Sequence, residues 1–581
     1  MSGWGRFESW LTRDRFGLRA AAIGVVLSLP ALGVGFVADD HFLRATSLGL
    51  NPPELTLASK LDLFRFFSGE KWRYDAWVER GITPWWAPED LRVSFWRPVA
   101  SALHQLDFAL FHSPVPMHAH SLVWLALLVL AAAALFRRLH RAPWVAALAA
   151  LVFAVDDGHG VPVGWLSNRN GVVATCFAVL ALVTHDRWRR DGWRPGLPLS
   201  LAALSAGLLS GEIALGALGG VLAHALVFER DRRSKLLAAA PALALVAAWR
   251  VAYSALGYGA HGSGLYIDPL HSPFAFLVAA VERLPLLVLG QLGGLPSDAW
   301  AFVPRPVGAA LAVAALLACV PLGRALSGLV RNDPVARFYA LWLVLALVPG
   351  CATFPNDRLL MVASVAGAGL VAQALATWRG GGPVSRVTAI FLLAVHLVAA
   401  PLGLPPRAYS MSFLANATVR SIEQVPHDLA GKTLVVVNAP DGLMCAQILA
   451  HGASLGVRLP ARLRCVGVSR DTVTVTRPTE RSLALATRDG FFSGTLDTLF
   501  RAADIPWHVG DGPRTTAVRV SVAALAASGR PSELRADFDE PLESDAHVFI
   551  VWRGKSYVRF VPPPVGGSVA LPPTNMAEVI F

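Results

Sequence analysis

The sequence predicts an all-α polytopic membrane domain followed by a β-rich soluble α/β domain. The 581 residues are 54% hydrophobic and only 16% charged, with a mean hydropathy of +0.50, which is typical of polytopic membrane proteins. The net charge of +11 comes from short basic clusters between apolar segments, a pattern that reflects membrane topology and excludes a nucleic-acid-binding face. Beyond about Pro405 the long apolar segments give way to short β-branched runs.

The predicted membrane domain covers residues 1–404 and contains about eleven spans. The first span, 18–38, is long enough to cross a hydrocarbon core of about 30 Å. A large outer loop follows at 39–117, and its amphipathic, Trp-rich pieces predict helices that lie in the interface. The other spans are expected near 118–136, 142–155, 170–185, 196–210, 212–228, 236–256, 307–323, 338–354, 359–378 and 386–403.

Basic residues in alternate loops predict the orientation. Clusters follow the spans that end near 136, 185 and 228, whereas the loop 257–273 contains no Lys or Arg. By the positive-inside rule, we expect a cytoplasmic N-terminus and an extracytoplasmic C-terminal domain in a bacterial-type inner (plasma) membrane. Residues 274–296 are apolar but contain Glu282, Arg283 and Pro285, and crossing would place the basic cluster at 324–337 outside. We therefore expect an interfacial or re-entrant helix there.

The C-terminal domain, 405–581, is expected to be soluble and extracytoplasmic. Strands are predicted at 433–438, 471–476, 517–522 and 547–552, with one helix near 443–455. Its two cysteines, Cys445 and Cys465, are candidates for a disulfide in an oxidising compartment. No catalytic motif is found in this domain.

Two adjacent carboxylates, Asp39 and Asp40, end the first span. Charge at a membrane boundary is costly unless it faces water, a cavity or a partner, so the pair is a candidate functional site. The alternative is a helix terminus held by two solvated acids. Further polar residues lie at the predicted outer ends of spans: Asp156, Asp157, His159, Arg169, Glu212 and Arg358. A transporter more often places such groups at the midplane, whereas this arrangement favours a site that takes a lipid head group from the bilayer edge.

Several of these residues lie in segments that resemble motifs of the GT-C glycosyltransferase superfamily. More narrowly, they are similar to motifs of the transmembrane and tetratricopeptide-repeat-containing O-mannosyltransferases. In chain order the segments are Ser94–Asp107 with Arg97-Pro98, Asp156–Arg169, Leu209-Ser-Gly-Glu212 and Asp357–Gly367. Val37-Ala-Asp39-Asp40 falls where the family has its acidic first-loop motif. Asp156 stands where the family has a histidine, Gly211 where it has a lysine, and the repeats are missing.

The resemblance implies an inverting transfer of a monosaccharide from a polyprenyl-phosphate carrier to a glycan, lipid or protein acceptor on the outer face. Such chemistry requires a base for the acceptor hydroxyl and positive charge for the departing phosphate. Asp40 is the first candidate for the base and Asp39 the second. Arg358 and Arg169 are candidates for the phosphate, because guanidinium pairs with phosphate as a fork, and Arg97 is a third.

The remaining groups have supporting roles in this hypothesis. His159 could orient the phosphate or the acid pair. For both His159 and Glu212, a structural hydrogen bond is the favoured alternative to a catalytic role. Asp156 and Asp157 could hold a divalent cation with Asp40 or could form only a polar turn. Metal dependence and cofactors stay open, because no ligand set is diagnostic.

A second hypothesis is a non-catalytic membrane scaffold or a lipid-sugar transporter with the same fold. The altered histidine and lysine positions motivate it. It predicts binding of a glycolipid without turnover, so an assay of sugar transfer separates the two hypotheses.

Overall fold

The computed structural model describes residues 8–12, 14–51, 59–303, 305–380, 382–426, 429–575 and 579. The chain divides into two compact units, each assembled from three segments. The helical unit comprises Met1–Val34, Trp96–Leu256 and Pro269–Met411. The mixed unit comprises Gly35–Phe95, Gly257–Asp268 and Ser412–Phe581.

This division differs from the expected boundaries at 1–404 and 405–581. Most of the expected outer loop 39–117 folds with the C-terminal residues, because its strands and helices pack there. Residues 52–58 of that loop lie outside the described part of the chain.

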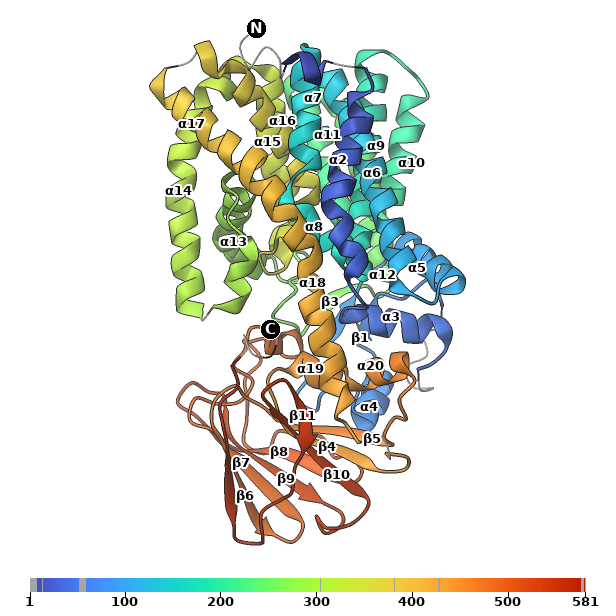
Figure 1. Cartoon of the computed structure of the whole chain (residues 1–581), viewed down its shortest axis with the longest axis vertical. Helices are drawn as coiled ribbons and strands as arrows, with labels where there is room; N and C mark the ends of the chain where they lie inside the picture. The colour runs from blue at the N-terminus through green and yellow to red at the C-terminus, as the bar shows by residue number, and fades with distance from the viewer. Residues whose placement is uncertain are drawn as a thin grey trace. The chain divides into compact units, whose positions relative to one another are not determined.

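Apolar helices build the helical unit (Figure 1). In order they are α2 (Phe16–Ser28), α5 (Pro98–Leu110), α6 (Pro114–Leu139), α7 (Pro143–Ala154), α8 (Gly160–Gly164), α9 (Arg169–Arg190), α10 (Gly196–Leu208), α11 (Leu215–Phe228), α12 (Arg232–Ala255), α13 (Pro273–Gly293), α14 (Arg305–Asn332), α15 (Pro334–Leu347), α16 (Met361–Thr377), α17 (Pro383–Ala394) and α18 (Ala400–Glu423). The last of these, α18, continues past the boundary at Met411.

The predicted all-α polytopic domain is confirmed, with a smaller number of full spans. Within the described residues, nine helices are long and apolar enough to cross a membrane. A tenth forms if α7 and the segment Asp157–Gly164, bent by 43°, count as one span. Three of the eleven predicted spans are too short for the ~20 residues of a typical crossing: α10 and α11 have 13 and 14 residues, and α7 alone has 12. The nine helices also include α13, which was not predicted to span.

Ion pairs join the basic loops at one end of the helical unit, the basic end. Arg138 Nε, after α6, lies 2.6 Å from Asp186 Oδ2 on α9. Arg189 Nε on α9 lies 2.7 Å from Glu229 Oε1, which follows α11. The loops that charge predicted to share one membrane side therefore meet in space.

The loop between α14 and α15 joins the same end through a short hydrogen-bonded chain. His140 Nδ1, after α6, lies 3.0 Å from Gln373 Oε1 on α16. Gln373 Nε2 in turn donates to Asp333 Oδ2, between α14 and α15 (2.5 Å). The basic cluster at 324–337 thus belongs to the basic end, as predicted.

Helix α13 covers the segment expected to be interfacial or re-entrant. It is long and apolar enough to cross a membrane. The groups on either side of it nevertheless lie at the end of the helical unit opposite the basic end. We call this the acidic end, because Asp157, Asp298 and Asp357 lie there. Tyr253, near the end of α12, bonds Glu212, and Asp298, which follows α13, pairs with Arg407 beside Asp157. A segment that leaves and rejoins the same end supports the re-entrant interpretation.

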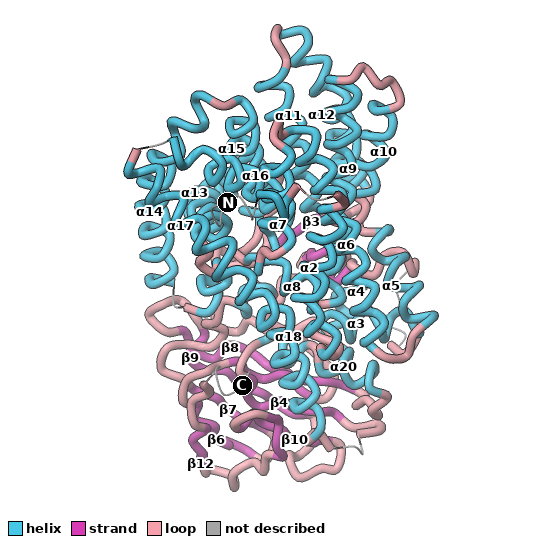
Figure 2. Tube along the Cα trace, turned by 45° about the horizontal axis from the view of Figure 1, so that its top comes forward, coloured by secondary structure: helices cyan, strands magenta, loops and turns pink. Residues whose placement is uncertain are grey.

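Three sheets form the framework of the mixed unit (Figure 2). The strands are β1 (Arg65–Ser68), β2 (Arg92–Ser94), β3 (Gly259–His261), β4 (Thr433–Ala439), β5 (Arg462–Val468), β6 (Val473–Thr479), β7 (Ser482–Ala486), β8 (Val518–Leu525), β9 (Pro531–Phe538), β10 (His547–Arg553), β11 (Ser556–Arg559) and β12 (Ser568–Leu571). The helices are α3 (Asp39–Leu48), α4 (Lys71–Arg80), α19 (Gly442–Ala446) and α20 (Ile448–Leu455). Each predicted C-terminal strand and the predicted helix are confirmed within about two residues at the N-terminal ends.

The sheets explain why segments far apart in sequence form one unit. In the order β1-β2-β3, antiparallel strands join the first loop to residues 259–261. In the sheet β11-β10-β4-β5, β4 pairs in parallel with both neighbours, and its seven residues are all buried. An antiparallel sheet, β12-β6-β7-β9-β8, completes the unit. A strand that is buried on both faces requires a continuous apolar run, which Leu434–Val437 provides in β4.

Cys445 and Cys465 are buried neighbours in the mixed unit. Both line the same small cavity, and both are free thiols in the structure. Proximity agrees with the expected disulfide, whose formation stays a prediction.

Candidate functional site

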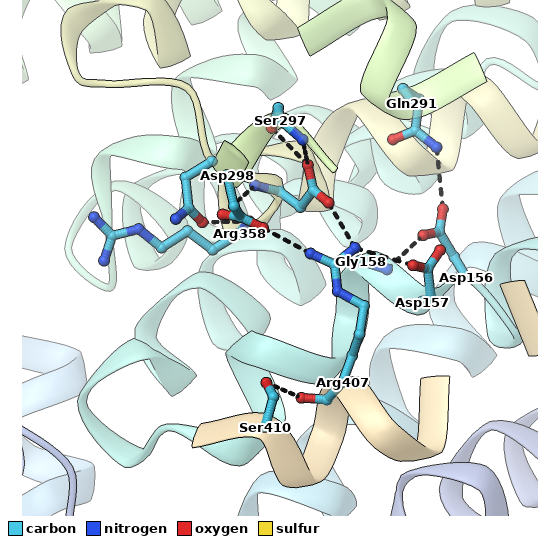
Figure 3. A network of polar contacts seen from close by, with 11 residues as sticks. Asp156, Asp157, Gly158, Gln291, Ser297, Asp298, Arg358, Arg407 and Ser410 are labelled. Carbon is cyan, nitrogen blue, oxygen red and sulfur yellow. Dashed lines mark hydrogen bonds and ion pairs between the residues drawn. The ribbon is translucent and has the colours of Figure 1, made fainter. Parts of the chain in front are cut away.

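One guanidinium at the acidic end of the helical unit binds three carboxylates (Figure 3). Arg407 on α18 lies 2.9 Å from Asp157 Oδ2 and 2.6 Å from Asp357 Oδ2 through Nη1, and 2.7 Å from Asp298 Oδ2 through Nη2. These carboxylates follow α7, precede α16 and lie between α13 and α14, respectively. We call these four residues the Arg407 cluster.

Negative charge exceeds positive charge in the Arg407 cluster when all its carboxyl groups are ionised. Asp357 receives further hydrogen bonds from Ser297, through the backbone N–H (2.9 Å) and the hydroxyl (2.5 Å). Asp298 lies outside the spans, and burial, together with the charge of Asp357, raises its pKa from 3.8 to about 6. Asp298 therefore takes up a proton closer to neutral pH than a free aspartate does.

Asp156 is engaged separately from Asp157. Its Oδ1 accepts the backbone N–H of Gly158 (2.9 Å), and its Oδ2 accepts Gln291 Nε2 from α13 (3.0 Å). The side chain therefore closes the turn after α7 and ties it to α13. This is the polar-turn interpretation of the pair.

Arg358 follows Asp357 directly, but its side chain has different surroundings. The guanidinium lies over the rings of Trp165 and Phe354, 5.3 and 5.5 Å from their centroids. Its Nε is buried and has no hydrogen-bond partner among the described residues, which also offer the side chain no ion pair. In Figure 3 the side chain points away from the Arg407 cluster. Cation–π contacts leave the N–H donors available for an anion.

Arg169, at the start of α9, differs from Arg358 because its guanidinium is paired and hydrogen-bonded within the protein. It is 1% exposed, and its Nη2 lies 2.5 Å from Asp107 Oδ2 on α5. Nη1 donates to the carbonyl of Met117 (3.1 Å) and contacts His120 Nδ1 (3.2 Å). With its charge balanced and its donors used, Arg169 stabilises the packing of α5, α6 and α9. This differs from the expected contact with a lipid phosphate.

Arg97 and Glu212, both predicted site residues, bind each other. Arg97 Nη2 lies 2.6 Å from Glu212 Oε2, and Tyr253 donates its hydroxyl to Glu212 Oε1 (3.3 Å). Both charged side chains are about one-fifth exposed. The pair joins the start of α5 to the turn before α11.

His159 is buried at 1% exposure in the bend after α7. Neither ring nitrogen has a hydrogen-bond partner among the described residues, and the ring contacts Phe153 edge-to-face with centroids 4.7 Å apart. The ring makes no hydrogen bond or ion pair with an acidic or arginine side chain among the described residues, and the backbone N–H donates to the carbonyl of Asp156 (3.3 Å).

The predicted acid pair begins α3 in the mixed unit, and its two members differ. Asp40 is 1% exposed, and its Oδ2 accepts the backbone N–H of Val37 (2.9 Å). The turn between them contains Ala38 at φ +43°, a conformation that non-glycine residues rarely adopt. Asp40 therefore holds a strained helix start, which differs from its expected role as the first candidate for the base.

Asp39 is half-buried and lines a cavity of about 120 Å³ within the mixed unit. The cavity wall is mostly apolar, with residues from α3, β1, α4 and α20. A carboxylate beside an apolar cavity can accept a proton from a bound hydroxyl. The geometry thus favours Asp39 over Asp40.

The sequence missed several members of the Arg407 cluster. Arg407 follows Pro405-Pro406, which suggested the end of a span, whereas α18 continues through both prolines. Asp298 lies in a loop with no motif, and Asp357 was noted only as the neighbour of Arg358. The described residues contain no group of three His, Cys, Asp or Glu that could hold a metal ion.

No protein-family model and no curated protein sequence matches this chain. Among solved structures, it is similar to the Archaeoglobus fulgidus oligosaccharyltransferase AglB in complex with an inhibitory peptide and a dolichol-phosphate. That match has 12% identity and a TM-score of 0.39, over 78% of this chain and 64% of the other. The A. fulgidus enzyme tethered to an acceptor peptide with an NVT sequon matches at 12% identity and a TM-score of 0.37, with the same coverage. Its complex with Zn and sulfate matches at 14% and 0.35, over 76% and 62%. The chain thus spans less than two thirds of the length of these proteins.

Proposed function

We propose that this protein is a membrane glycosyltransferase that takes a sugar from a lipid-phosphate donor. Arg358 carries the proposal. A guanidinium at the acidic end, flanked by two aromatic rings and without an ion pair in the described chain, suits a phosphate group that arrives from the bilayer. The ordered motif resemblance supports the same chemistry.

The transfer proceeds by displacement at the anomeric carbon. The acceptor hydroxyl loses its proton to Asp39, and its oxygen forms the new glycosidic bond with inversion. The bond from the anomeric carbon to the phosphate oxygen breaks, and its electron pair leaves with the lipid phosphate. Arg358 stabilises the charge that develops on that phosphate.

The finer assignment follows the family that the motifs resemble. We propose a polyprenyl-phosphate monosaccharide as donor and a bacterial-type inner membrane, with the acidic end and the mixed unit extracytoplasmic. The basic end then faces the cytoplasm, as the positive-inside rule requires.

The proposal is tested with Arg358→Met in the purified protein, reconstituted with a polyprenyl-phosphate sugar. We expect transfer to fall about 10²–10³-fold, the usual effect of removing a donor to a developing oxyanion. Thermal stability should stay close to that of the wild type, because the side chain makes no ion pair in the described chain.

Arg233→Met is the matched control, because Arg233 is an exposed arginine of the basic end. It should retain full transfer. Wild-type transfer rates in Arg358→Met would refute the phosphate role.

A non-catalytic scaffold or lipid-sugar carrier is the second candidate. It is favoured by the burial of Asp40 and Arg169, two predicted site residues with structural partners. It predicts that the wild-type protein binds the donor and leaves it intact. Detection of sugar transfer by the wild-type protein would exclude it.

A further inference from the structure

The cavity beside Asp39 has the volume of one small ring. It measures about 120 Å³. An engineered protein cavity of about 150 Å³ lined by Leu, Ile and Phe binds benzene. A single six-membered ring therefore fits inside, whereas a disaccharide or a long alkyl chain would extend beyond the cavity.

Aromatic side chains form much of the cavity wall. Phe67 on β1 contacts Trp77 and Phe500 edge-to-face, with centroids 5.9 Å apart in each pair. Phe42 and Phe66 line the cavity as well, with centroids 5.5 Å apart. Such a wall offers ring faces and edges to a bound aromatic ring, which gains from offset or T-shaped contacts.

Few polar side chains line the cavity. Among the described residues that line the cavity, Asp39 is the only carboxylate. Gln447, Tyr266 and the Trp77 indole are the uncharged polar groups. A pyranose would bury several hydroxyls here with too few partners, and each unsatisfied hydroxyl is costly. One hydroxyl, in contrast, can donate to Asp39, since a carboxylate accepts several hydrogen bonds.

We infer that this cavity binds a phenol, an aromatic ring with one hydroxyl that donates to Asp39. Only the role of that hydroxyl as the acceptor of the sugar rests on the proposed function. Binding itself requires only the cavity and the carboxylate. A glycan acceptor does not fit this cavity.

The test measures binding of 4-fluorophenol by ¹⁹F NMR to the full-length protein in lipid nanodiscs, with empty nanodiscs as the reference. No sugar donor is present. We expect saturable binding, and at least about tenfold weaker binding of fluorobenzene, which lacks the charge-assisted hydrogen bond. Methyl glucoside should not compete.

Substitutions in the cavity wall test whether the ¹⁹F NMR signal comes from binding in this cavity. Ala446 and Ala450 line the cavity, so Ala446→Leu should abolish binding of 4-fluorophenol, and Ala450→Val gives a milder reduction if the larger change prevents folding. Leu455→Ala is the control, because Leu455 is exposed on α20 and lies outside the lining. It should bind like the wild type.

Three outcomes would overturn the inference: unchanged binding in both cavity variants, equal binding of fluorobenzene, or displacement of 4-fluorophenol by methyl glucoside. Tighter binding of 1-octanol would also overturn it and indicate a lipid alcohol. Addition of the donor then separates the two proposals. A bound phenol that is never glycosylated would refute its acceptor role and leave the binding site intact.

Discussion

Arg358 and Arg169 both lie at the start of a helix in the helical unit, and motif and charge assign them the same role. Their surroundings differ completely. Arg169 is buried with Asp107 and bonds Met117 and His120, whereas Arg358 lies over two aromatic rings without an ion pair in the described chain. The comparison shows that the partners of an arginine side chain decide whether the side chain can bind a ligand.

The same contrast separates Asp39 from Asp40. Asp40 accepts a backbone N–H and holds the start of α3, while Asp39 lines the cavity. In each pair, one residue is almost fully buried, and the other borders a place where a ligand could bind. Substitutions can break or sharpen this comparison.

The largest effect is expected at the acid pair. Asp39→Asn should lower sugar transfer about 10²–10⁴-fold, because it removes the proposed general base and leaves the size of the side chain unchanged. Asp40→Ala should instead lower the free energy of unfolding by about 1–3 kcal/mol, because it leaves the buried N–H of Val37 without its acceptor, with transfer per folded molecule within about threefold. Transfer assays and thermal unfolding of both variants check this. The reverse pattern would restore Asp40 as the base.

A similar test applies to the buried arginine. Arg169→Met leaves the buried Asp107 without its guanidinium and with His120 as its remaining partner (2.7 Å), which should cost up to about 3–5 kcal/mol of unfolding free energy. Arg169→Met combined with Asp107→Leu removes both charges and should recover most of that loss. The measurement is unfolding of the reconstituted protein. A stable Arg169→Met with impaired donor binding would show that Arg169 serves the ligand after all.

A smaller effect concerns pH and the mixed unit. Asp497 accepts the backbone N–H groups of Gly442 and Gly494, yet burial and the charge of Asp441 raise its pKa from 3.8 to about 7. The folded state therefore retains a proton that the unfolded state loses near pH 4. This contribution to the free energy of unfolding should fall as pH rises from about 4 to 7 and then level off.

Thermal unfolding of the wild type and Asp497→Asn between pH 5 and 8 tests this dependence. The difference between the two proteins is the informative quantity, because burial lowers the pKa of His41 to about 4 and gives an opposite slope. We expect the stability of the variant relative to the wild type to rise with pH. A difference that stays constant across the range would contradict the raised pKa.

The sequence was sufficient for features that depend on local pattern. Alternating or β-branched runs predicted β4, β6, β8 and β10, and the basic clusters predicted which loops meet at the basic end. Asp156-Asp157 and Asp357-Arg358 were recognised as polar groups at span ends, and the structure brings Asp157 and Asp357 onto one arginine.

The partners of each residue could not be read in the same way. Asp107 and Arg169 are 62 positions apart, and Asp157 and Arg407 are 250 apart, so their pairing depends on the packing of whole helices. Adjacent identical residues such as Asp39 and Asp40 offer no pattern that reveals which one is buried. The turn at Ala38, with its positive φ, makes that choice.

Arg407 binds carboxylates from three loops of the chain, and Asp298 lies 141 residues after Asp157 and 59 before Asp357. The loops are coupled, because Arg407 binds all three carboxylates and Ser297 and Gln291 add hydrogen bonds between the same loops. Release of the guanidinium would leave the carboxylate charges to repel one another. The loops after α7, after α13 and before α16 should therefore fluctuate as one cooperative unit, with a common rate of amide hydrogen exchange. In this sense Arg407 sets the timescale on which the acidic end of the helical unit opens.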